Sequence, residues 1–159
     1  MHPNTVAAAH IGQALGLAAQ ALFLSNPNPR VGCVITAPDG QVLGQGFTQQ
    51  AGGPHAEVMA LRDAAAKGHD VGGATAYVTL EPCSHHGRTG PCCDALAQAG
   101  IAKVVASIAD PIALVAGGGF GRLRAAGVEV VVGPGDAESR ELNIGVFSRV
   151  VRGTPWVRL

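Results

Sequence analysis

Residues 74–80 read ATAYVTL, a run of β-branched, aromatic and small apolar residues that predicts a buried strand. Residues 91–100 follow with a proline at their start and a glycine at their end, the order typical of a helix and its termination. A second apolar strand is expected at 103–108. A strand, a helix and another strand in this order predict parallel strands joined by a helical crossover, and hence an α/β fold.

The same alternation continues on both sides of this unit. Upstream, we expect two helices around a β-hairpin with an Asp-Gly turn: a helix at 5–24, strands at 31–36 and 41–47, and a helix at 55–67. Downstream, we expect a helix at 120–126, a strand at 128–132 and a helix at 136–151. Together these elements predict a mixed five-stranded sheet, mostly parallel with one antiparallel hairpin, and helices on both faces.

Length and composition exclude several classes of protein. The chain has 159 residues, close to the size of one domain, and 47% of them are hydrophobic. Eleven Lys and Arg balance eleven Asp and Glu, so the positive charge expected of a nucleic-acid-binding protein is missing. Residues 6–24 are apolar, but polar side chains interrupt them and no basic residue precedes them, so we expect a surface helix. We therefore expect a cytoplasmic protein with reduced cysteines and with no nucleic-acid or membrane partner.

Three short motifs carry side chains suited to metal chemistry. They are His55-Ala56-Glu57 at a helix start, Pro82-Cys83 after a strand and Pro91-Cys92 at the next helix start. In α/β sheets, ligands bind at the carboxyl ends of strands beside helix N-termini, so these motifs are expected to meet. One His and two Cys provide three ligands of a tetrahedral zinc and leave the fourth position to water, as in a catalytic site. Glu57 is then placed to carry a proton without being a ligand.

Other residues compete for these roles. Cys93 is the rival of Cys92, but adjacent helical positions point about 100° apart, so we expect only one of the pair, Cys92, to face the metal. Cys33 lies in an apolar strand and is expected to be a small buried hydrophobic residue. His85 and His86 are interpreted as loop residues, either near substrate or exposed. Taken alone, Glu57 could also be an acidic residue that the dipole of its helix favours in the first turn.

A longer sequence pattern narrows the class of zinc protein. His-x-Glu followed by Pro-Cys and a further Cys is typical of zinc nucleobase deaminases, in which two residues separate the cysteines, whereas residues 84–91 separate them here. With this longer loop, the chain resembles over essentially its whole length the N-terminal deaminase domain of the bifunctional riboflavin-biosynthesis deaminase/reductase family. The matching motifs are NPNPRVG at 26–32, GPHAEV at 53–58 and TLEPCSHHGRTGPC at 79–92. Shorter matches lie at 110–111, 115–117, 141–143, 152–153 and 155–157.

The resemblance implies a three-layer α/β/α cytidine-deaminase-like fold with one Zn²⁺ bound by His55, Cys83 and Cys92. It implies that Glu57 is the proton shuttle of a zinc-dependent aminohydrolase acting on a cyclic amidine. The implied substrate is diaminohydroxyphosphoribosylaminopyrimidine, a small-molecule pyrimidine ribotide, which is deaminated with release of ammonia. The resemblance also favours a homo-oligomer.

Asn28 and Arg88 match positions that contact substrate in that family. An arginine suits the ribotide phosphate in its own right, because the planar guanidinium binds phosphate oxygens in pairs.

The sequence departs from the family pattern at two places. Where the family has Asp-Pro-Asn-Pro, this chain has Asp110-Pro111-Ile112-Ala113, and Ile112 cannot make the hydrogen bond expected of the asparagine. If that asparagine faces a buried polar group of the ligand, its loss weakens binding by about 1–3 kcal/mol. Thr48 stands where many relatives have His.

The resemblance also predicts the domain organisation. We expect residues 1–150 to form the pyrimidine deaminase domain and residues 151–159 to correspond to the start of a reductase domain, with the reduction step outside this chain. Two other functions stay open: a zinc deaminase of another nucleoside or base, including one in tRNA, and a non-catalytic zinc-stabilised domain. The neutral charge argues against tRNA. The presence of three ligands beside Glu57 argues against a purely structural site, which usually has four protein ligands.

Overall fold

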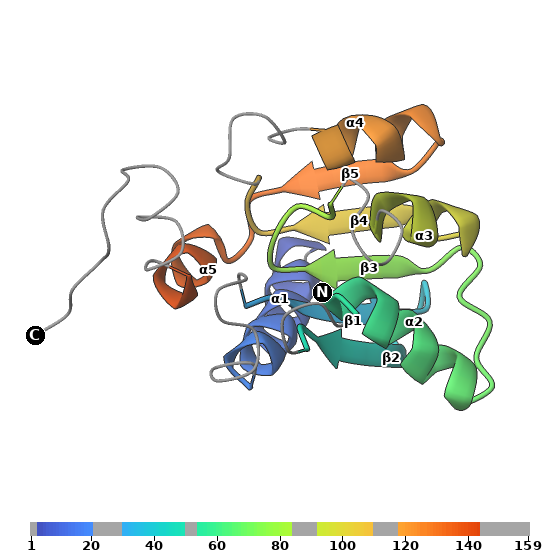
Figure 1. The fold of residues 1–159 in the computed structure, drawn as a ribbon, viewed down its shortest axis with the longest axis horizontal. Helices are drawn as coiled ribbons and strands as arrows, with labels where there is room; N and C mark the ends of the chain where they lie inside the picture. Colours follow the sequence, from blue (N-terminus) through green and yellow to red (C-terminus); the bar gives the residue numbers. More distant parts are fainter. Residues whose placement is uncertain (1–2, 21–29, 50–53, 84–91, 110–117, 144–159) are drawn as a thin grey trace, which may run out of the picture.

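The computed structural model describes residues 3–20, 30–49, 54–83, 92–109 and 118–143 (Figure 1). These residues form one sheet of five strands with helices packed against it. The strands are β1 (Gly32–Thr36), β2 (Val42–Phe47), β3 (Thr75–Val78), β4 (Lys103–Ala106) and β5 (Glu129–Val132). The helices are α1 (Pro3–Ala19), α2 (Ala56–Ala66), α3 (Cys92–Gln98), α4 (Gly118–Ala125) and α5 (Asp136–Leu142). In this part of the chain, no helix is both long and apolar enough to cross a membrane.

The sheet is mixed, as the sequence predicts. Its order is β2-β1-β3-β4-β5. Strand β1 is antiparallel to both of its neighbours, β2 and β3, whereas β3, β4 and β5 are parallel to one another. It follows that β2 and β3 run in the same direction. The carboxyl ends of β2, β3, β4 and β5 therefore lie together at one end of the strands.

Helices cover both faces, so the fold has three layers. On one face, α2, α3 and α4 bury a cluster that includes Ala60, Leu96 and Leu123 against Ile35 and Val104 of the strands. On the other face, Ile11 and Ala14 of α1 pack on Val34, Tyr77 and Val105. Figure 1 shows α2, α3 and α4 in front of the sheet and α1 behind it. The alternation of side chains along β1, β3 and β4 explains why both faces of these strands are apolar.

Small residues let helices approach the first two strands closely. A Cβ atom on Gly44 or Gly46 would collide with the backbone of α2, and one on Gly32 would collide with the backbone of α1. Gly46 is also flanked by Ala56 and Ala60 of α2, so alanines on the helix face glycines on the strand. This close packing places the N-terminus of α2 beside the end of the sheet.

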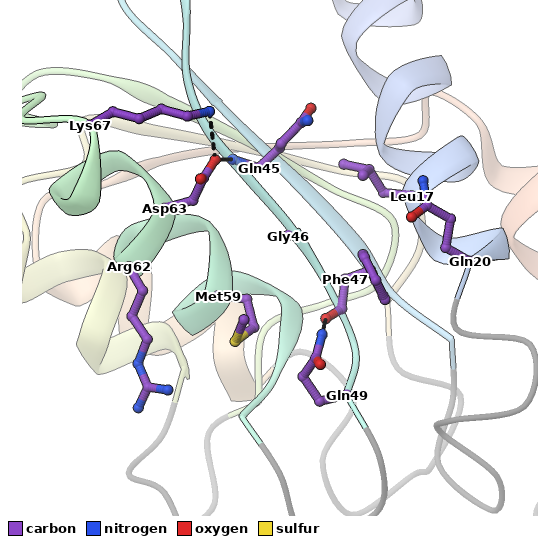
Figure 2. A pocket seen from close by; sticks show the side chains of 10 residues that line it. All are labelled: Leu17, Gln20, Gln45, Gly46, Phe47, Gln49, Met59, Arg62, Asp63 and Lys67. Atoms are coloured by element: carbon purple, nitrogen blue, oxygen red, sulfur yellow. Dashed lines mark hydrogen bonds and ion pairs between the residues drawn. The ribbon is translucent and has the colours of Figure 1, made fainter.

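The two edges of the sheet differ. Along the outer edge of β2, the Gln45 amide donates to Asp63 Oδ2 (2.9 Å), while the carbonyls of Leu43 and Phe47 accept hydrogen bonds from His69 and Gln49. Figure 2 shows Asp63 between Gln45 and Lys67, beside a pocket that α1, β2 and α2 line. At the opposite edge, Val131 and Val132 of β5 are 39% and 44% exposed. Along β2, side chains thus bind backbone amide and carbonyl groups with which a further strand would have to pair.

Two helix boundaries differ from the prediction. The first helix begins at Pro3, ahead of the expected residue 5, and its described part ends at Ala19. The last helix, expected at 136–151, ends at Leu142 with Asn143 as its C-cap, and the Asn143 side chain bonds to the backbone of Arg30 and Ser139. Residues 21–24 and 144–151 of the two predicted helices lie outside the described part.

Candidate active site

His55 lies at the N-terminus of α2. It is the N-cap residue, with an extended backbone, and its side chain makes no capping hydrogen bond. Its carbonyl instead accepts the first helical hydrogen bond, from the Met59 amide (3.0 Å). A histidine is an unusual N-cap residue, since Ser, Thr, Asp and Asn are preferred there. The imidazole is therefore available for another partner.

Cys83 lies beyond the carboxyl end of β3, where the N-terminus of α3 meets it. The Cys92 amide donates to Cys83 Sγ (3.2 Å), and the Cys93 amide donates to the Cys83 carbonyl (3.2 Å). These two amides are first-turn donors that a helix leaves without internal partners. A negative charge on Cys83 is favoured at such a helix end.

The side chains of His55, Cys83 and Cys92 form a cluster. His55 Nδ1 lies 3.1 Å from Cys92 Sγ and 3.6 Å from Cys83 Sγ. One ligand atom from each residue lies within 4.8 Å of the others. In a tetrahedral zinc site, Zn–S bonds of about 2.3 Å and Zn–N bonds of about 2.1 Å hold ligand atoms about 3.6–3.8 Å apart. The donor set and its spacing fit zinc, and within the described ranges no other such group of three metal-binding side chains occurs.

The two thiols of the cluster shift each other's pKa in opposite directions. The hydrogen bond from Cys92, with further contributions from His55 and the Cys92 amide, lowers the pKa of Cys83 to about 4. The same thiol pair raises the pKa of Cys92, and burial adds to this effect. The hydrogen bond to Cys83 raises the pKa of His55. Cys83 is thus the thiolate of the cluster, and a cation bound there would favour the loss of the second proton.

Glu57 lies in the first turn of α2, two residues after His55, and is 3% exposed. Burial, followed by the negative charge of Cys83, raises the pKa of Glu57 to about 7. The Cys92 thiol acts in the opposite direction and lowers the pKa of Glu57. A buried carboxyl group with a pKa near neutrality, next to three metal-binding side chains, is suited to proton transfer.

The other two cysteines lie in the apolar core. Cys93 packs with Leu96 in the cluster between α3 and the sheet, and Cys33 packs in the same cluster from β1. Burial raises the pKa of Cys33 well above its usual value, and raises that of Cys93 to about 11. Both thiols are therefore neutral, and the structure brings Cys92 rather than Cys93 to His55.

Several residues named from the sequence lie outside the described part. These are Asn28 and Arg88, expected to contact substrate, as well as His85, His86, Ile112 and Ala113. Thr48 is described, and it is buried with its side chain and amide both bonded to Val31.

Glu81 is a site-supporting residue that the sequence analysis did not single out. Its Oε2 atom accepts hydrogen bonds from the Gly119 (2.9 Å) and Phe120 (3.2 Å) amides at the start of α4. Its own amide donates to the Ile108 carbonyl (2.9 Å). The sequence shows Glu81 directly before the Pro82-Cys83 motif, and glycines at 118 and 119. Only the fold shows that these two segments meet.

The match to a known family agrees with this geometry. The family model of the cytidine and deoxycytidylate deaminase zinc-binding region matches residues 5–108. The chain belongs to this family. The matched range contains all three cluster residues and Glu57. The deaminase family therefore accounts for the metal-binding side chains found at the carboxyl ends of the strands. The predicted deaminase identity and zinc cofactor are thereby confirmed at the level of the family.

Curated relatives point to one branch of the deaminases. The chain is 53% identical to riboflavin biosynthesis protein RibD of Escherichia coli over 94% of its length, and 47% identical to RibD of Aquifex aeolicus over 92%. It spans 40% of the length of each of these relatives.

Solved structures confirm the predicted fold class. RibD of Acinetobacter baumannii superposes with a TM-score of 0.91 at 46% identity, covering 98% of this chain and 42% of that one. The Thermotoga maritima deaminase/reductase superposes with a TM-score of 0.93 at 40% identity, covering 98% and 44%. A dCMP deaminase from cyanophage S-TIM5, at 23% identity and a TM-score of 0.65, shares the fold over 83% of this chain and 99% of that one.

Proposed function

We propose that this chain catalyses the hydrolytic deamination of diaminohydroxyphosphoribosylaminopyrimidine, the pyrimidine ribotide of riboflavin biosynthesis, and releases ammonia. The observation that carries this proposal is the cluster of His55, Cys83 and Cys92 beside the buried Glu57. Support for the substrate comes from relatives: RibD of E. coli is named a riboflavin biosynthesis protein, and the T. maritima protein is named a diaminohydroxyphosphoribosylaminopyrimidine deaminase combined with a 5-amino-6-(5-phosphoribosylamino)uracil reductase.

In the proposed site, His55 through Nδ1 and the sulfurs of Cys83 and Cys92 hold a zinc ion. A zinc ion held by three protein ligands supplies an activated water and polarises the group under attack. At the start of α3, the Cys92 amide donates to Cys83 Sγ and stabilises its negative charge, while the Cys93 amide donates to the Cys83 carbonyl and orients the residue.

Glu57 moves the protons. Hydrolysis replaces the ring amino group by oxygen, so one water adds to the carbon and ammonia leaves. The Glu57 carboxylate accepts one proton from the water and delivers it to the ring nitrogen. It then accepts the second proton, from the hydroxyl group added to the carbon, and delivers it to the departing amine as the C–N bond breaks. The buried position of Glu57 favours this role because burial brings its pKa close to neutral pH, where a carboxyl group both accepts and releases protons.

Substrate contacts stay predictions. We propose that Asn28 and Arg88 bind the ribotide, with Arg88 pairing with its phosphate. Ile112 replaces the asparagine that the riboflavin-pathway pattern has at that position, so we expect a higher KM than in relatives that keep it, by about tenfold for one lost hydrogen bond.

Two alternatives are less well supported. Deamination of another nucleoside or base is disfavoured because the identity to a dCMP deaminase is 23%, against 53% for a riboflavin-pathway relative. A tRNA substrate also fits poorly with a net charge of zero. A non-catalytic zinc domain would have no use for the buried Glu57, because burial of a carboxyl group lowers stability.

The first prediction tests the proposal directly. The zinc-loaded protein is expected to release ammonia from the ribotide, while Glu57→Gln retains zinc and fold but loses turnover by a factor of about 100 or more. Ammonia release, zinc content and circular dichroism check these outcomes. Glu129→Gln, which alters an exposed carboxylate on β5, is the matched control and should keep full activity.

Any of three results would contradict the proposal. Normal turnover by Glu57→Gln would remove the proton-shuttle role. No turnover by the fully zinc-loaded parent, together with turnover of dCMP or cytidine, would replace the substrate assignment. If neither the parent nor Ile112→Asn turns over any of the three compounds, the non-catalytic alternative is the better description.

We also propose that the deaminase works in the cytoplasm as a homo-oligomer, with residues 1–150 as its domain and 151–159 leading toward a reductase domain. All four cysteines are free, as is usual for proteins of reducing compartments.

The exposed Val131 and Val132 on the edge strand β5 are apolar surface of the kind that association buries. Light scattering of the purified protein measures the oligomeric state.

A further inference from the structure

Glu81 is a buried residue that joins the segment after β3 to two other elements. It lies two residues ahead of Cys83 and is 5% exposed. Its Oε2 atom accepts hydrogen bonds from the Gly119 (2.9 Å) and Phe120 (3.2 Å) amides at the start of α4. Its own amide donates to the carbonyl of Ile108, just beyond the end of β4 (2.9 Å). One residue thus connects the ends of β3 and β4 with the start of α4.

The start of α4 is a favourable partner for a carboxylate. The first amides of a helix have no partners within the helix, and they carry the positive end of its dipole. A carboxylate that accepts two of these amides therefore satisfies both of them, and such bonds are stronger than those to an uncharged acceptor. Burial of a carboxyl group without partners would lower stability. The contact with α4 thus explains why Glu81 can be buried.

The chain between Glu81 and Cys83 has little freedom. Pro82 is fully buried, and its ring fixes the backbone angle φ. Gly119 lies so close to Pro82 that a Cβ atom on the glycine would collide with the proline carbonyl. The start of α4 therefore holds the Glu81 side chain and the Pro82 backbone together, and Cys83 is the next residue.

Cys83 depends on such contacts more than the other two members of the metal-binding cluster. His55 is the N-cap of α2 and Cys92 is the first residue of α3, so a helix fixes the backbone of each. Cys83 lies outside the helices and strands. On its far side, the Cys92 amide donates to its sulfur and the Cys93 amide to its carbonyl (both 3.2 Å). The contacts of Glu81 hold the near side.

We propose that Glu81 is a positioning residue of the metal site. By binding the start of α4, it fixes the Pro82-Cys83 segment, so that Cys83 Sγ stays beside His55 and Cys92, where their ligand atoms lie within 4.8 Å of one another. Glu81 acts on the metal through Cys83, and residues that orient a ligand in this way govern metal affinity. The proposal rests on the proposed function only where turnover of the ribotide is measured.

Zinc affinity, measured by competition with a chelator, tests the proposal without substrate. Glu81→Ala is expected to weaken zinc binding by about 10–100-fold, the usual effect of removing a residue that orients a ligand. Glu81→Gln keeps an oxygen acceptor at the same place and should bind zinc within about threefold of the parent, since its hydrogen bonds are weaker but present.

Val128→Ala is the matched control for a general loss of stability. Val128 is 5% exposed, as Glu81 is, and it lies in the apolar cluster that α4 helps to bury. It precedes β5, at the opposite end of the strands from the metal-binding cluster. This variant should lower Tm but keep the parental zinc affinity.

Cobalt and hydrogen exchange give two further readouts. The visible absorption of Co²⁺ bound by thiolates depends on the geometry of the ligands, so it should change in Glu81→Ala and keep its parental form in Glu81→Gln and Val128→Ala. The Gly119 and Phe120 amides should be protected from exchange in the parent, and Glu81→Ala should speed their exchange by about tenfold or more.

Kinetics connect the metal site to the proposed reaction. With saturating zinc, Glu81→Ala should lower kcat for the ribotide by about tenfold and leave KM within about twofold, because the change affects the metal site and not the contacts that bind the ribotide. A parent protein that does not turn over the ribotide would contradict the proposed function. The role of Glu81 would then still be decided by zinc affinity and the cobalt spectrum.

Three results would overturn the role of Glu81. The first is a parental zinc affinity and cobalt spectrum in Glu81→Ala. The second is an equal loss of zinc affinity in Val128→Ala, since that would trace the effect to stability alone. The third is a loss in Glu81→Gln as large as in Glu81→Ala, because the acceptor would then be present without effect. If Glu81→Ala does not fold, Glu81→Asp, whose side chain is one methylene group shorter, takes its place with the same expected outcomes.

Discussion

Cys92 and Cys93 are adjacent, yet they have opposite environments. Cys92 faces His55 and Cys83, with its sulfur 3.1 Å from His55 Nδ1. Cys93 is turned by about 100° along the helix and packs in the apolar cluster with Leu96. The same substitution can therefore be made at Cys92 and at Cys93, and the two variants can be compared.

We expect Cys92→Ser to lose its zinc and Cys93→Ser to keep about one equivalent, because only the first sulfur belongs to the proposed ligand set. Cys93→Ser should instead lower the free energy of unfolding by about 1–2 kcal/mol, since it places a hydroxyl group in an apolar core. Metal analysis and urea unfolding measure the two effects. A full zinc content in Cys92→Ser would remove this residue from the ligand set.

At the scale of elements, the N-terminus of α4 packs directly on the segment that carries Cys83. A Cβ atom on Gly119 would collide with the Pro82 carbonyl, whereas one on Gly121, in the same helix, would meet nothing within 4 Å. The carboxylate of Glu81 also binds the first amides of α4. The absence of a side chain at Gly119 is therefore what lets α4 support the metal-binding segment.

This packing predicts opposite effects of two glycine substitutions in α4. Gly119→Ala should lower zinc content and stability, because either α4 or Pro82 must move. Gly121→Ala should raise the free energy of unfolding by about 0.5–1 kcal/mol, since alanine is the better helix former. Thermal unfolding and metal analysis of both variants check this. Equal stability and zinc content in the two variants would be inconsistent with the close approach of α4 to Pro82.

The edge of β2 gives a pH-dependent prediction. The hydrogen bond from the Gln45 amide, helped by Lys67, lowers the pKa of Asp63 below its usual value. A lowered pKa in the folded state contributes stability above the unfolded pKa of about 3.9, and this contribution is lost as the pH falls through the folded value.

We therefore expect Asp63→Asn to destabilise the protein at neutral pH by about 0.5–1 kcal/mol, a small effect because the side chain is 31% exposed to solvent. The difference from the parent should shrink as the pH falls through the folded-state pKa of Asp63, and disappear once the parental carboxylate is protonated in the folded state as well. Urea unfolding as a function of pH measures it, with Asp39→Asn, on the exposed hairpin turn, as the control. A difference that grows toward acid pH would have the wrong sign.

At the scale of the whole molecule, the sheet has an apolar core on each face, and the metal-binding cluster lies beside these cores rather than within them. The cluster nevertheless joins the start of α2, the segment after β3 and the start of α3. A bound zinc should thus add to a fold that the two cores already support.

Removal of zinc is therefore expected to abolish turnover and lower Tm without unfolding the protein at 25 °C, because a ligand that binds only the folded state stabilises it by mass action. Chelation followed by circular dichroism and a thermal scan checks this, and added Zn²⁺ should restore both activity and Tm. A chain that loses its secondary structure on chelation would show that the cores alone are insufficient.

The sequence alone determined the order and type of the ten elements found in the described residues, and the mixed sheet, because apolar periodicity, Pro and Gly positions and the Asp-Gly turn are local signals. It also singled out His55, Glu57, Cys83 and Cys92 as candidates, since these residue types suit a zinc site with a neighbouring proton carrier. Only the tertiary structure decided which atoms meet. It selected Nδ1 of His55, turned Cys93 into the core, brought Glu81 to α4, and joined Asn143, Thr48 and Thr79 on Arg30–Gly32. These contacts join residues far apart in the chain, and their geometry depends on the packing of the whole sheet, which no local pattern contains.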